Sequence, residues 1–104
     1  MEEHLQRHTA ALDMIRALCA SGMDAVEAVK VVVEEFGRDA LRASPDETDW
    51  NTAHHLVDIL VREYNAEFVF AMDLATTLFG REALQDLCDM VQRHLRQRLF
   101  GESN

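Results

Sequence analysis

The stretch Phe68-Val-Phe-Ala-Met-Asp-Leu-Ala-Thr-Thr-Leu-Phe79 contains one charged residue, Asp73, and neither proline nor glycine. A helix on the surface of a globule needs an apolar stripe along one side only. This segment is apolar around nearly the whole circumference of a helix, which indicates that other parts of the chain, or a second copy of it, cover most of its surface. We therefore expect the fold to be organised around residues 68–79.

The apolar pattern continues N-terminally from this stretch as one helical face that reaches back to Trp50. A start signal precedes it, because Ser44 can cap a helix, Pro45 suits the first helical position and Glu47 completes a capping box. The sequence thus predicts one long central helix over about residues 45–78, in which Asn65 is a weak position.

A straight helix of that length would measure roughly 50 Å at 1.5 Å per residue. A compact chain of about 100 residues has a radius of gyration near 13 Å, and so a diameter of about 33 Å. The central helix must therefore either kink near Asn65 or be covered by a second subunit. The apolar character of residues 68–79 favours coverage by a second subunit, so we predict a homodimer.

Three further amphipathic helices are predicted, over residues 3–20, 24–36 and 81–100. Gly22 and Gly37 follow the first two helices, where a glycine can take the left-handed conformation that ends a helix. The expected fold is all-α, a small bundle of four main helices in a single domain over residues 1–104. Residues 101–104 are expected to form a flexible tail.

One short pattern occurs twice in the chain. Residues 36–41 read Phe-Gly-Arg-Asp-Ala-Leu, and residues 79–84 read Phe-Gly-Arg-Glu-Ala-Leu, 43 positions later. The favoured interpretation is a shared local device in which an aromatic anchor, a glycine terminator and an acidic first turn end one helix and start another. A duplicated helical hairpin would also produce the pattern.

The chain is acidic, with a formal net charge of −9 over 104 residues. The charge is uneven, because residues 1–92 hold 18 acidic and 7 basic side chains, whereas residues 93–104 hold three arginines and one glutamate. Such a field repels nucleic-acid phosphates and anionic lipid heads. We therefore expect neither direct nucleic-acid binding nor membrane binding. The charge favours a partner with a basic surface, or it serves only to keep the protein in solution.

Cys19 and Cys88 are the only cysteines, and two cysteines do not make a disulfide framework. The acidic start Met1-Glu2-Glu3 is unlike the basic opening of a secretory signal peptide. No apolar run approaches the length of a membrane span. The predicted location is the cytoplasm, with both thiols reduced.

Few residues suggest chemistry. His54, His55 and Asp58 lie close together early in the predicted central helix and are weak candidates for metal ligands, since a site needs three or four converging groups. No cofactor motif is present. The expectation is that the chain is not an enzyme; the competing hypothesis is a small metal- or nucleotide-dependent enzyme that uses these residues together with Glu63 and Glu67.

The favoured hypothesis is a binding protein that inhibits or tunes a protein partner through helix contacts. Aromatic residues dominate the hot spots of such contacts, and the candidate residues for a partner or dimer interface are Trp50, Tyr64, Phe68, Phe70, Met72 and Leu74. Size and class favour an antiactivator of a bacterial transcriptional regulator. A DNA-mimic inhibitor and a structural subunit of a larger assembly are two further hypotheses.

Overall fold

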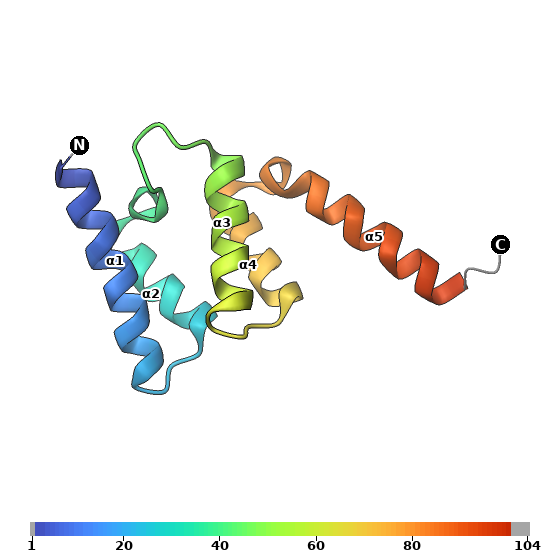
Figure 1. Cartoon of the computed structure of the whole chain (residues 1–104), viewed down its shortest axis with the longest axis horizontal. Helices are drawn as coiled ribbons and strands as arrows, with labels where there is room; N and C mark the ends of the chain where they lie inside the picture. Colours follow the sequence, from blue (N-terminus) through green and yellow to red (C-terminus); the bar gives the residue numbers. More distant parts are fainter. Residues whose placement is uncertain (1, 101–104) are drawn as a thin grey trace.

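The computed structural model describes residues 2–100, and every element within that range is helical (Figure 1). The α-helices are α1 (Glu2–Ala20), α2 (Ala25–Phe36), α3 (Asp49–Arg62), α4 (Phe68–Phe79) and α5 (Gln85–Phe100), with 3-10 turns η1 (Arg38–Leu41) and η2 (Arg81–Leu84). The predicted all-α class is confirmed. The tail predicted over residues 101–104 lies outside the described residues, as do the side chains of Glu2, Val91, Leu99 and Phe100.

The single helix predicted over residues 45–78 is two helices, so this prediction is wrong. Asn65 has a φ of 56°, and the Ala66 N–H donates to the Leu60 carbonyl at 2.9 Å. A residue in the left-handed conformation is a common way for a helix to end. Asparagine adopts that conformation more readily than most residues. The chain therefore reverses at Asn65, and α4 folds back against α3.

The predicted helix start at Pro45 is also displaced. Thr48 is the N-cap of α3, and its hydroxyl accepts a hydrogen bond from the Asn51 N–H at 3.1 Å. Ser44 instead forms a turn, in which its carbonyl accepts from the Glu47 N–H. Residues 42–48 are thus a loop that leads from η1 to α3 rather than the first turn of a helix.

The described chain consists of two units of the same design. In each, a helix ends in a left-handed residue, Gly22 or Asn65, and returns as a 12-residue helix. Each return helix ends in phenylalanine and a glycine of positive φ, 87° at Gly37 and 95° at Gly80, before a 3-10 turn. That turn packs against the first helix of its own unit. This arrangement favours the duplicated hairpin over a local helix-stop device.

The two units share one apolar core. Alanine residues at its centre let the helices approach closely, and six of them are fully buried: Ala11, Ala28, Ala40, Ala53, Ala71 and Ala75. Ile15, Val29, Leu60 and Leu84 fill the space between the helices. Equivalent positions are buried in both units, as with Ala28 on α2 and Ala71 on α4.

The last helix departs from this plan. A loop over residues 42–48 separates η1 from α3, whereas η2 runs directly into α5. Without a loop to reverse the chain, α5 projects from the body (Figure 1). The radius of gyration is 15.3 Å and the long dimension 54 Å, against about 13 Å for the radius of gyration of a compact chain of this length.

None of the helices in residues 2–100 combines the length and the apolar character that crossing a membrane requires.

Candidate functional site

A groove lies between α2 and α4, the return helices of the two units. Its volume is about 790 Å³. The floor and walls combine apolar side chains from both units, chiefly Val26, Val33, Tyr64, Phe70, Leu74 and Leu78. Because one wall comes from each unit, the groove exists only when the two hairpins are docked together.

Local sequence explains how each wall is built. The Asp24 carboxylate caps α2 by accepting from the Val26 N–H at 3.0 Å. Val26 and Val33 are seven residues apart and so lie on one side of that helix. On α4, Leu74 faces the core while Phe70, one turn earlier, is 57% exposed. Phe70 therefore offers a large apolar surface to any molecule in the groove.

Carboxylates line the groove beside its apolar floor. Five acidic residues contribute to the walls, namely Asp24, Glu27, Glu34, Glu67 and Asp73, against one cation, Lys30. Lys30 is already paired with Glu27 at 3.5 Å. Among the described residues, Glu34, Glu67 and Asp73 have no basic side chain within 4 Å. The groove is thus an apolar surface with an excess of negative charge.

The structure brings together three of the six predicted interface residues. Tyr64, Phe70 and Leu74 all line the groove. Tyr64 is half-buried, and its burial raises the pKa of the phenol. Phe68 and Met72 lie on α4 but do not line the groove, and Phe68 is 37% exposed.

Trp50 lies apart from the groove, in the first turn of α3. Its indole stacks on the His54 ring at a centroid distance of 4.0 Å, and the His54 Nδ1–H donates to the Trp50 carbonyl at 2.7 Å. The indole remains 47% exposed. It is therefore a second apolar surface, separate from the groove.

The three metal candidates do not form a site. His54 stacks on Trp50, His55 lies 3.4 Å from Glu47, and Asp58 pairs with Arg62 at 2.9 Å. Across residues 2–100, no three His, Cys, Asp or Glu side chains are close enough together to hold a metal ion. Each candidate instead has a partner of its own.

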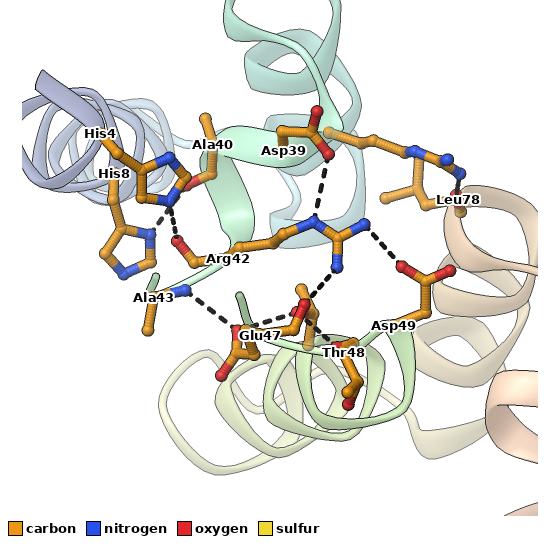
Figure 2. A network of polar contacts seen from close by, with 12 residues as sticks. His4, His8, Asp39, Ala40, Arg42, Ala43, Glu47, Thr48, Asp49 and Leu78 are labelled. Carbon is orange, nitrogen blue, oxygen red and sulfur yellow. Dashed lines mark hydrogen bonds and ion pairs between the residues drawn. The ribbon is translucent and has the colours of Figure 1, made fainter. Parts of the chain in front are cut away.

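A polar clamp holds the two units in register at the loop that joins them (Figure 2). The Arg42 guanidinium donates to Asp39 at 3.1 Å, to the Glu47 carbonyl at 2.8 Å and to Asp49 at 2.5 Å. The hydrogen bond to Asp49 raises the pKa of Arg42. Arg38 adds a bond to the Leu78 carbonyl at 2.6 Å.

The Glu47 carboxylate also stabilises the loop over residues 42–48. Its Oε1 accepts from the Ala43 N–H at 3.0 Å and from the Thr52 hydroxyl at 2.8 Å. Burial alone raises the pKa of this carboxyl, but these two hydrogen bonds and the nearby His55 outweigh it, so the pKa of Glu47 lies below its ordinary value. The carboxylate form is therefore the one that the fold prefers.

A smaller cavity of about 130 Å³ lies between α1 and α3. Its polar lining includes His8, Arg16, Glu47 and His55 above a floor of aliphatic residues. Both His8 and Glu47 are already bonded, His8 through a 2.8 Å hydrogen bond to the Ala40 carbonyl. The cavity lies between the two units, and two of its polar groups are engaged in hydrogen bonds within the fold.

The sequence pattern did not reveal the acidic lining of the groove. Part of this lining could have been predicted, because Glu27 and Glu34 are seven residues apart and line the groove beside Val26 and Val33 on α2. The contribution of Glu67 and Asp73 could not be predicted from the sequence, because it depends on the chain reversal at Asn65.

No protein-family model, curated protein or solved structure matches this chain.

Proposed function

We propose that this protein is a protein-binding regulator that receives an amphipathic, basic helix of its partner in the groove between α2 and α4. The observation that carries the proposal is the pairing of an exposed apolar anchor, Phe70, with unpaired carboxylates along the same groove. An apolar groove takes the apolar face of a helix, and the carboxylates favour cations at the margins of that helix.

The energetic roles of the two components differ. Burial of Phe70 and the aliphatic floor supplies affinity, at about 25 cal/mol per Å² of apolar surface removed from water. Exposed charge pairs contribute less, roughly 0.2–1 kcal/mol each. They act mainly on selection, because an acidic helix would be repelled and a basic helix attracted. Binding is therefore expected to weaken as salt is raised.

We further propose that the partner is a transcription regulator and that binding inhibits it. Helices that read DNA carry donors for bases and cations for phosphates. An acid-lined groove that covers such a helix competes directly with DNA for the same side chains. This mode of action is that of an antiactivator, and it requires no catalytic group on this chain.

A designed peptide tests the binding step without a known partner. The probe is an amphipathic Leu/Lys helix of about 16 residues, long enough to span the groove at 1.5 Å per residue. A Leu/Glu helix of the same pattern and a scrambled Leu/Lys sequence are the controls. Titration into ¹⁵N-labelled protein should shift the amides of groove residues at micromolar Leu/Lys peptide, and neither control should do so. Equal binding of the Leu/Glu helix, or shifts confined to other surfaces, would contradict the proposal.

Two matched variants locate the contact. Phe70→Ser removes an exposed aromatic residue in the groove, and Trp50→Ser removes one of similar exposure outside it. Burying a phenylalanine side chain is worth about 1.5–3 kcal/mol, so Phe70→Ser should weaken peptide binding by roughly tenfold or more. Trp50→Ser should leave it within about twofold. The reverse order would place the partner on α3.

A further inference from the structure

The helix α5 carries two large apolar side chains that nothing in its own described chain covers. Met90 and Leu95 are 53% and 51% exposed. Within residues 2–100, the main contact of α5 is with η2, from which it projects (Figure 1). An isolated helix of this length is marginal in water, so α5 gains stability if it packs against another surface.

The charge of α5 is opposite to that of the body. Residues 2–84 hold sixteen carboxylates against seven cations, whereas α5 holds Asp86 and Asp89 against three arginines. Arg93, Arg96 and Arg98 are all exposed, and none has an acidic partner within 4 Å in the described chain. Exposed apolar side chains next to free cations are what the acid-lined groove selects.

We infer that α5 of one copy occupies the groove between α2 and α4 of a second copy, and that the exchange is reciprocal. Direct continuation from η2 carries α5 away from its own body, so the groove of another molecule is the available receptor. At 1.5 Å per residue, α5 is about 24 Å long and the 12-residue helices that form the groove are about 18 Å. The lengths match well enough for α5 to span the groove.

Reciprocity gives the contact twice for each pair of chains. Stable protein interfaces bury about 1,200–2,000 Å² in total, and two helix-in-groove contacts reach that range more readily than one. Exchange of an identical element between protomers is a common route to a dimer. This inference rests on the proposed function, because the same groove would then be occupied by the protein itself before a partner arrives.

Self-occupancy regulates partner binding. When a fraction of the grooves is filled by α5, the apparent dissociation constant for a partner rises in inverse proportion to the fraction left free. With about 90% of grooves filled, that constant rises about tenfold. A partner must therefore compete with α5, and the protein binds best when dilute or when α5 is displaced.

A complementation experiment tests the exchange. Leu95→Asp damages α5 and Phe70→Asp damages the groove, and both side chains are exposed in the single chain, so both variants should fold. Light scattering at about 50 µM should give twice the chain mass of 11.9 kDa for the wild type and the single mass for each variant. Leu5→Asp, an equally exposed leucine on α1, is the matched control and should stay dimeric.

Mixing the two variants is decisive. In the mixture, the intact α5 of Phe70→Asp can enter the intact groove of Leu95→Asp, so a mixed dimer should form. With one variant labelled by ¹⁵N, native mass spectrometry identifies that species. A dimer that Leu95→Asp splits and mixing does not restore would mean that α5 pairs with α5, which overturns the inference. A wild type that is monomeric at about 50 µM overturns it as well.

The same variants separate this inference from the proposed function. Leu95→Asp has an empty groove, so it should bind the Leu/Lys peptide about tenfold more tightly than the wild type. If the wild type is monomeric and both proteins bind the peptide equally, α5 exchange is wrong and the binding function stands. If mixing restores the dimer but neither protein binds the peptide, the groove serves self-association only and the proposed function is wrong.

Discussion

Replacement of Arg42 by methionine should destabilise the protein more than replacement of any exposed charged residue. The Arg42 side chain is only 13% exposed and donates to three acceptors in two units. Methionine retains most of the aliphatic packing but offers no donor. The substitution therefore removes the clamp between the units while filling a similar volume.

The magnitude follows from the exposure of each acceptor. Asp39 and Asp49 are 70% and 47% exposed, so water can replace the guanidinium, and each pair is worth about 0.2–1 kcal/mol. The half-buried Glu47 carbonyl loses a charged donor, which costs about 1.5–3 kcal/mol. The contact of Arg42 with the Phe79 ring, 5.6 Å from its centre, adds about 0.5–1 kcal/mol. Since such terms are not fully additive, we expect a loss of about 2–4 kcal/mol.

Urea unfolding followed by the fluorescence of Trp50, the only tryptophan, measures this loss. The midpoint should fall while the slope with denaturant stays constant, which identifies a change in stability alone. Arg16→Met is the control, because Arg16 and its partner Asp13 are both more than 60% exposed. That variant should lose less than about 0.5 kcal/mol. Equal losses for the two variants would refute the assignment of Arg42 as a clamp.

Three other outcomes are expected. Gly37→Ala and Gly80→Ala should each lower the free energy of unfolding, measured in urea, by about 1–3 kcal/mol, because both residues hold a backbone conformation that is essentially restricted to glycine. No atom lies within 4 Å of an added Cβ at either position, so the cost comes from the backbone and not from a clash. A clear difference between the two variants would show that the two units are not equivalent. The pKa of Glu47 is lower in the folded than in the unfolded state, so its carboxylate stabilises the fold at pH values above the unfolded-state pKa of about 4.3. This stabilisation is lost as the pH falls through the folded-state pKa. The difference in free energy of unfolding between the wild type and Glu47→Gln should therefore shrink as the pH falls from about 5 to about 3. Burial and the nearby Asp24 raise the pKa of the Cys19 thiol, so in a Cys88→Ser background its alkylation by iodoacetamide should need a higher pH than that of a free thiol, a difference that urea should abolish.

The sequence predicted helices well where strong local signals mark their ends. Gly22, Asp24 and Gly37 bound α1 and α2 within about two residues of the predicted positions. Each acts within a few residues of itself, through a positive φ or a capping carboxylate. Signals of this kind can be recognised from the sequence alone, because they do not depend on the tertiary fold.

The reversal at Asn65 was not readable from local signals alone. Asn65 occupies in the second unit the place that Gly22 occupies in the first, and in both units the next residue donates a backbone bond back to the helix. That bond spans six residues from Ala66 to Leu60 and five from Met23 to Leu18. Asparagine also occurs inside helices, and the apolar pattern runs through residues 63–67 without a break. Tertiary packing of α4 on α3 decides that the chain reverses at Asn65 instead of continuing as one helix. The reversal could have been predicted by comparing the two units, but not from the helical period.

The same reversal creates the groove, which connects the error in the fold prediction to the incomplete prediction of the site. A straight helix would carry Phe70 away from α2 and leave its aromatic ring without a second wall. Folding α4 back places Phe70 and Asp73 opposite Val26 and Glu27 and so combines an apolar anchor with carboxylates from separate units. The width of the groove then depends on how firmly the units are held together, and Arg42 is a principal link between them. If the groove binds helices as proposed, Arg42→Met should weaken binding of the Leu/Lys peptide even in the folded variant, although Arg42 lies outside the groove.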